Sequence, residues 1–162
     1  LDPKLADYKK QPKYNRFFVA CGGADPLNLT PQILPLVPAD TFEYDSCFVI
    51  GPNFKHEFEH PNGWHIMYAP KPAEMLDYMA CFSTVICAWG NTAFEASYLG
   101  CRVFAIPTCE EHVGEIKCFG LEPLLPTELN TLPERLRKPV KNVSLDLNGA
   151  KRILQFMTKI KE

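Results

Sequence analysis

The chain has 162 residues, the length of one ordinary domain and enough to bury a hydrophobic core without disulfides. Hydrophobic residues make up 46% and charged residues 22% of the sequence, values that argue against disorder and against a coiled coil. The net charge of −2 provides no positive field for nucleic acid or an anionic membrane, and no apolar run reaches the roughly 18 residues of a membrane-spanning helix.

Residues 1–15 are polar, rich in lysine and contain two prolines, so we expect a linker or an edge segment there. From residue 16 onward, short apolar runs alternate with segments of helical spacing. In chain order we predict a strand at 16–21, a helix at 31–37, strands at 47–50 and 64–68, a helix at 72–82, a strand at 84–88, a helix at 91–99, a strand at 102–106 and a helix at 110–119. Thr30 is the expected N-cap of the first helix, with Pro31 at its first position.

The pattern weakens after Gly120. A short strand at Leu124-Leu125 and a helical turn or two at 129–136 are the structures that this stretch allows. A last helix is predicted from Asp146 onward. Its expected apolar face consists of Ala150, Ile153, Leu154, Met157 and Ile160.

Short, almost wholly apolar strands that alternate with helices are typical of a parallel sheet covered on both faces. We therefore predict an α/β fold: one open, doubly wound, Rossmann-like domain over residues 16–162. Sheets of this kind bind ligands at the carboxyl ends of their strands.

Seven cysteines occur at irregular spacing, without a C-x-x-C pair. Cys21, Cys47 and Cys87 lie inside apolar runs. This usage indicates reduced, buried thiols of a cytoplasmic protein rather than a disulfide framework, and we expect no metal site.

The segment 21–30 follows the first predicted strand and contains Gly22 and Gly23. Paired glycines let a ligand approach the backbone amides, and the helix that follows adds a partial positive charge suited to a diphosphate. A Gly-Gly pair after a strand is equally compatible with a simple tight turn.

The segment 88–100 repeats this arrangement, because a strand ends, Gly90 turns the chain, and Asn91 and Thr92 open a helix. Glu95 lies one turn further along this helix, so its side chain can reach a ligand bound at the helix start. Two purely structural alternatives exist here: Thr92 and Glu95 form a capping box, or Asn91 is the N-cap.

The segment 107–112 ends in Glu110, Glu111 and His112. These side chains either face a bound sugar or form a solvated helix start, with acids placed favourably near the helix dipole.

The motif GGADPLNLT at 22–30 resembles the corresponding loop of the UDP-sugar hydrolases of pseudaminic acid biosynthesis and of related spore-coat polysaccharide proteins. The pattern A-x-G-x-T-x-x-E-x-x-x-L-G at 88–100 resembles the UDP-binding motif of the same group and, more widely, of GT-B glycosyltransferases. The resemblance covers about residues 16–120. It implies the C-terminal, UDP-binding half of a GT-B fold.

The resemblance also implies roles for particular residues. Backbone amides of Gly22 and Gly23 would face the diphosphate, in a loop held through Asp25, Asn28 and Thr30. The remaining implied nucleotide contacts are Gly90, Asn91 and Thr92 at the phosphates, Glu95 at the ribose hydroxyls, and the backbone of Met67, Tyr68 and Ala69 at the uracil. Glu111 and His112 would face the sugar.

The sequence departs from the family pattern in three ways. Glu111-His112 stands where the family usually has Asn-Gln, and Cys101-Arg102 stands where a small residue and a proline are usual. The N-terminal GT-B domain, which supplies the catalytic histidine in this family, is absent from the chain. The chain begins at Leu1 rather than Met, so we expect a part of a longer protein or a partner subunit for that domain.

The expected function is UDP-sugar binding within an enzyme of surface-polysaccharide or nonulosonic acid biosynthesis that hydrolyses or transfers the sugar. No catalytic residue, metal or cofactor besides UDP or the UDP-sugar is expected in this chain, and the isolated domain should be inactive. The alternatives are a GT-B glycosyltransferase with a sugar or lipid acceptor and a non-catalytic binding subunit.

Overall fold

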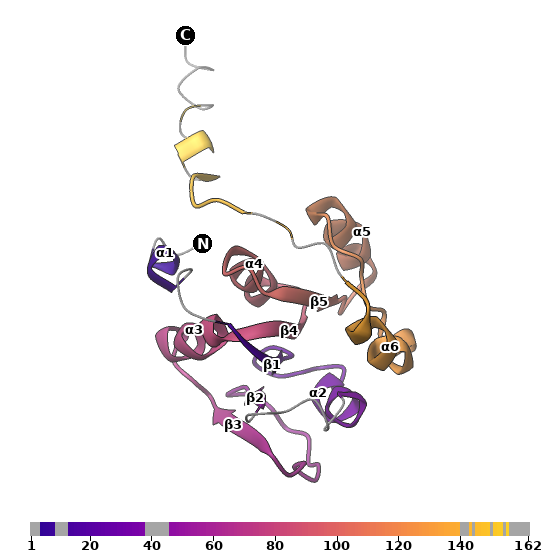
Figure 1. Ribbon diagram of the computed structural model, residues 1–162. Coiled ribbons are helices and arrows are strands. Elements are labelled where there is room, and N and C mark those ends of the chain that lie inside the picture. Colours follow the sequence, from indigo (N-terminus) through magenta and orange to yellow (C-terminus); the bar gives the residue numbers. More distant parts are fainter. Residues whose placement is uncertain are drawn as a thin grey trace.

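The computed structural model describes residues 4–8, 13–37 and 46–139, and from there on residues 143, 145–149, 151–153 and 155. Its centre is a parallel sheet with helices packed on both faces (Figure 1). The strands are β1 (Tyr14–Ala20), β2 (Ser46–Ile50), β3 (Trp64–Tyr68), β4 (Phe82–Ala88) and β5 (Arg102–Ile106), in the spatial order β3-β2-β1-β4-β5. Every neighbouring pair is parallel, which confirms the predicted Rossmann-like α/β fold.

Two groups of helices cover the two faces of the sheet. The first group consists of α1 (Leu5–Tyr8), α3 (Pro72–Cys81) and α4 (Asn91–Tyr98). On the opposite face lie α2 (Leu29–Ile33) with its 3-10 extension η1 (Leu34–Leu36), η3 (Pro126–Thr131) and α6 (Leu132–Arg137). Helix α5 (Glu110–Phe119) follows β5 and buries Ile116 in the core of the first face.

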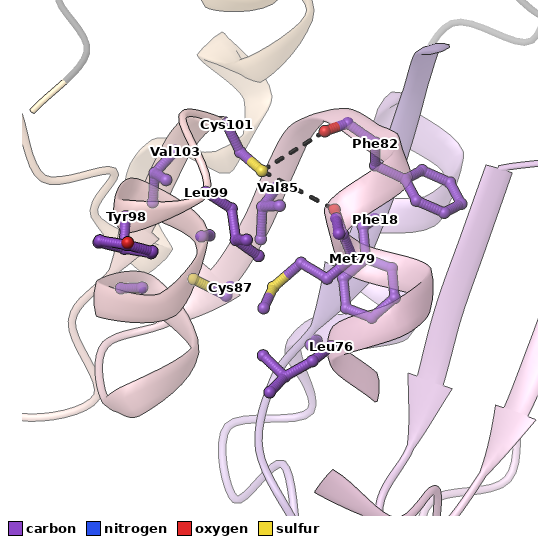
Figure 2. Close-up of a cluster of buried hydrophobic side chains, with 14 of the residues drawn as sticks. Phe18, Leu76, Met79, Phe82, Val85, Cys87, Tyr98, Leu99, Cys101 and Val103 are labelled. Atoms are coloured by element: carbon purple, nitrogen blue, oxygen red, sulfur yellow. Dashed lines mark hydrogen bonds between the residues drawn. The ribbon is translucent and has the colours of Figure 1, made fainter. Parts of the chain in front are cut away.

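The strands read as continuous apolar runs because both of their faces are buried. On β1, Phe18 and Ala20 belong to the core under α3 and α4, whereas Phe17 and Val19 belong to the core under α2 and α6. Figure 2 shows the first core, in which the Cys101 thiol also donates to the carbonyl oxygen of Phe82 at 3.4 Å.

The buried thiols behave as the sequence predicts. Cys21, Cys47 and Cys87 are buried in the sheet, and burial raises the pKa of the Cys47 and Cys87 thiols to about 12. Burial raises the pKa of Cys21 as well. These three side chains are therefore neutral hydrophobic groups at physiological pH.

The predicted strands lie within about two residues of their observed positions, but the start of the first helix was wrong. Thr30 and Pro31 lie inside α2, and the N-cap is Asn28, with a left-handed backbone conformation and no capping bond from its side chain. The helix tightens to 3-10 geometry at Leu34–Leu36, where Pro35 cannot donate a helical hydrogen bond.

The weak pattern after Gly120 produces no strand at Leu124-Leu125. Leu124 instead donates one backbone hydrogen bond to Ala105 at 3.0 Å, so this segment runs along the edge of β5. The turns predicted at 129–136 are helical, in η3 and α6.

The last predicted helix is described only at residues 149, 151–153 and 155, which are helical. Ile153 is 61% exposed, so the expected burial of the apolar face is wrong at this residue. The other members of that face, Ala150, Leu154, Met157 and Ile160, lie outside the described residues.

At the other end of the chain, the described residues among 1–15 include a short helix and the start of a strand. Residues 5–8 form α1, whose Leu5 is fully buried, and Tyr14 and Asn15 belong to β1.

Cys101-Arg102, which stands where the resembled family has a small residue and a proline, has a structural explanation. Cys101 is buried in the first core, and the Arg102 guanidinium donates to the carbonyl oxygen of Leu136 at 2.6 Å and to that of Arg135. Arg102 therefore binds the carbonyl end of α6, where a positive charge is favourable.

Candidate nucleotide-binding site

The strand order places a crevice between β1 and β4. The chain leaves β1 toward β2 and leaves β4 toward β5, in opposite directions across the sheet. Open α/β sheets bind ligands at such a switch point, outside the carboxyl ends of the strands. The loops that follow β1 and β4, which contain Gly22 and Gly90, flank this point in the structure.

A hollow of about 190 Å³ lies at this edge of the sheet. Four segments that follow β1, β2, β3 and β4 contribute to its wall. The lining residues are Ala20, Gly22, Gly23, Val49, Gly51, Pro52, Pro70, Met75 and Thr92. None of these carries a charge, so a ligand in the hollow would be recognised mainly by backbone groups and the Thr92 hydroxyl.

The structure thus brings together three of the residues singled out from the sequence: Gly22, Gly23 and Thr92. Sequence reasoning missed Gly51, although a Gly-Pro pair directly after a strand could have indicated it. A Cβ atom added to Gly51 would lie 2.4 Å from the carbonyl oxygen of Gly23, so only glycine allows the two loops to approach this closely. Gly22, with φ of 90°, likewise adopts a backbone conformation that favours glycine.

Asp25 organises the loop after β1. It is 1% exposed, and its carboxylate accepts hydrogen bonds from the backbone amides of Leu29 at 2.7 Å and Thr30 at 2.8 Å. The start of α2 is thereby closed by a negative charge from within the loop. The expectation that this helix start adds positive charge for a diphosphate is therefore wrong, because the Asp25 carboxylate already binds the amides at the start of α2.

The start of α4 differs, because its N-cap is Gly90, which has no side chain that could cap the helix. Asn91 and Thr92 occupy the first two helical positions, so neither the Thr92–Glu95 capping box nor an Asn91 cap is formed. The first turn carries no acidic residue. Helix geometry leaves the first amides without intrahelical partners, and such an end favours an anion.

Two other helices that begin at this edge are less suited to an anion. The first turn of α3 contains Pro72, which has no N–H group, and Glu74. The first turn of α5 contains Glu110 and Glu111. Glu95, by comparison, lies one turn into α4 and is half-buried.

The segment after β3 lies at the same edge. Met67 is buried and Tyr68 is 63% exposed, while Ala69 donates its backbone amide to the carbonyl oxygen of Ile50 at 2.8 Å. Ala69 has φ of 43°, as Asp25 and Asn28 have φ of 45° and 52°. All the non-glycine residues with positive φ within the described ranges are in loops at this edge, and such strain clusters at functional sites.

Glu111 and His112 do not line the hollow. The backbone amide of Thr108 donates to Nδ1 of His112 at 3.3 Å, so Nδ1 is an acceptor and Nε2 carries the proton of the neutral ring. Hydrogen bonds from its own backbone amide and from the Cys109 thiol lower the pKa of Glu111.

In the part of the chain that is described, no helix is both long and apolar enough to cross a membrane. The same residues contain no group of three metal-binding side chains close enough to share an ion.

Comparison with known proteins finds a relative in Methanocaldococcus jannaschii, named uncharacterized protein MJ1062. It is 26% identical to this chain over 169 residues, and the alignment covers 97% of the chain but 34% of the relative. The chain therefore spans about a third of the length of that protein. No family model matches the chain, and no solved structure matches it.

Proposed function

We propose that this domain binds a UDP-sugar, with the diphosphate between the start of α4 and the Gly22–Gly23 loop. One observation carries the proposal: Gly22, Gly23 and Thr92 line one hollow at the switch point, beside a helix start whose N-cap residue, Gly90, has no side chain. Backbone amides and a helix dipole stabilise phosphate without a cationic side chain.

The remaining contacts follow from the positions around this hollow. Gly90, Asn91 and Thr92 provide backbone amides and a hydroxyl at the open helix start. Glu95 accepts hydrogen bonds from the ribose hydroxyls one turn further along α4. In this proposal the backbone near Met67, Tyr68 and Ala69 binds the uracil, and Glu111 and His112, which lie outside the hollow, contact the sugar.

In this proposal the domain is the binding half of a two-domain enzyme of the GT-B type, similar to the UDP-sugar hydrolase of pseudaminic acid biosynthesis. The N-terminal half, in the same protein or a separate subunit, supplies the catalytic histidine, and water attacks the anomeric carbon. The α4 start stabilises the negative charge that develops on the departing UDP. The reaction is cytoplasmic and uses no cofactor besides the UDP-sugar. A sugar or lipid acceptor in place of water makes the protein a glycosyltransferase.

A thermal-shift series with UDP, uridine and AMP tests the proposal. A ligand that binds only the folded form at a hundredfold excess over its Kd stabilises that form by about 2.7 kcal/mol. We expect UDP to raise the Tm more than uridine does, because the diphosphate makes the principal contacts, and AMP to have no effect. Equal shifts with UDP and AMP would contradict a uridine-specific site.

A further inference from the structure

The loop between β2 and β3 fastens the glycine loop after β1. Besides the close approach of Gly51 to Gly23, the backbone amide of Asn53 donates to the carbonyl oxygen of Gly23 at 2.8 Å. Three residues later, Nε2 of His56 lies 2.8 Å from the carbonyl oxygen of Asp25. Two segments that are far apart in the sequence are thus joined beside the hollow.

The direction of the His56 hydrogen bond follows from its partner. A backbone carbonyl can only accept, so Nε2 of His56 carries the proton and donates it. The His56 ring is half-buried and packs edge-on against Phe54, with 5.1 Å between the ring centroids. This packing restricts the ring, so the hydrogen bond holds Asp25 from outside its own loop.

Asp25 anchors the part of the glycine loop that adjoins α2. Its carbonyl oxygen also accepts from the amide of Asn28 at 2.9 Å, and its carboxylate binds the start of α2. Its backbone has φ of 45°, a conformation that persists only where the surroundings enforce it. Glycines have many alternative conformations, so the orientation of Gly22 and Gly23 depends on what fixes Asp25 as well as on the Asn53 hydrogen bond to Gly23.

We propose that His56 is a positioning residue that holds Asp25, and with it the Gly22 and Gly23 amides, in the geometry that receives a phosphate group. The inference rests on the proposed function for the identity of the ligand. A loop that is already ordered in the free protein does not have to be ordered during binding, so the binding step avoids that entropy cost.

Three variants separate the hydrogen bond from the packing of the ring. His56→Phe keeps an aromatic ring against Phe54 but removes the donor. His56→Gln removes the ring but retains an N–H donor at about the same reach. His60→Phe is the matched control, because His60 belongs to the same loop and packs against Phe58, with ring centroids 4.9 Å apart.

Two measurements are made on each variant: the Kd for UDP by calorimetry, and hydrogen exchange of the Asn28, Leu29 and Thr30 amides in the ligand-free protein. Loss of one hydrogen bond corresponds to about a fivefold change in an equilibrium. We therefore expect His56→Phe to exchange these amides about fivefold faster and to bind UDP about fivefold more weakly. His56→Gln and His60→Phe should stay within about twofold of the wild type.

The exchange data keep this inference distinct from the proposed function. Faster exchange in His56→Phe, together with no UDP binding by the wild type, would support the positioning role and reject UDP as the ligand. Unchanged exchange in His56→Phe would overturn the positioning role, whether or not UDP affinity falls.

Discussion

Helices α2 and α4 both begin at the carboxyl edge of the sheet, on either side of its switch point, yet their first turns differ. The amides of Leu29 and Thr30 in α2 are bonded to the Asp25 carboxylate, whereas the N-cap of α4 is Gly90, which has no side chain. A helix start in an α/β fold is therefore not an anion site merely because it follows a strand. The loop before α2 is bonded to its own helix through Asp25, and the start of α4 is the phosphate site that we propose.

The largest expected effect comes from removing the charge that closes α2. Asp25→Asn retains one acceptor oxygen but replaces the other with a donor that faces a backbone amide in a buried place. Hydrogen bonds to charged groups contribute about 1.5–3 kcal/mol, so we expect the free energy of unfolding to fall by roughly 2–3 kcal/mol. Urea denaturation measures this change. A loss below about 0.5 kcal/mol would show that Asp25 does not hold the loop.

The next largest effect is expected from a substitution of Glu95 in α4. The helix start at Asn91 excludes a capping box with Thr92 as the N-cap, and the proposed function assigns Glu95 to the ribose hydroxyls. Glu95→Gln removes the charge with little change in shape, and we expect the Kd for UDP to rise about tenfold. The variant should also lose its preference for UDP over 2′,3′-dideoxy-UDP. If that preference is unchanged in calorimetric titrations, the ribose is held elsewhere.

A smaller effect is expected from making the start of α4 resemble that of α2. Asn91→Asp places a carboxylate in the exposed first turn, where it competes with phosphate and interacts favourably with the dipole. We expect the Kd for UDP to rise about fivefold and the free energy of unfolding to increase by about 0.5 kcal/mol. Asn130→Asp, an identical change at an exposed position of η3, is the control and should leave the Kd unchanged. An equal change in both variants would indicate only a general charge effect.

The comparison also shows what the sequence could predict. The strands were predictable because burial on both faces makes each one a short apolar run, and the α4 start was predictable from Gly90 followed by Asn91. The closed start of α2 was not, because its cap comes from Asp25, a buried carboxylate upstream of the N-cap residue rather than the N-cap itself.

Contacts between segments distant in the sequence were also beyond prediction. The approach of Gly51 to Gly23 and the His56 hydrogen bond depend on how the β1 and β2 loops meet in space. No local periodicity or spacing encodes this meeting. The hollow itself combines residues from four such segments, and only Gly22, Gly23 and Thr92 of its lining residues were singled out from the sequence.

The most direct test of the account is to map UDP onto the backbone amides by nuclear magnetic resonance titration. We expect the largest shift changes at Gly22, Gly23, Asn91 and Thr92, with small changes at Leu29 and Thr30, whose amides are bonded to Asp25. Large changes at Leu29 and Thr30, with Asn91 and Thr92 unaffected, would contradict the assignment of the phosphate site to α4.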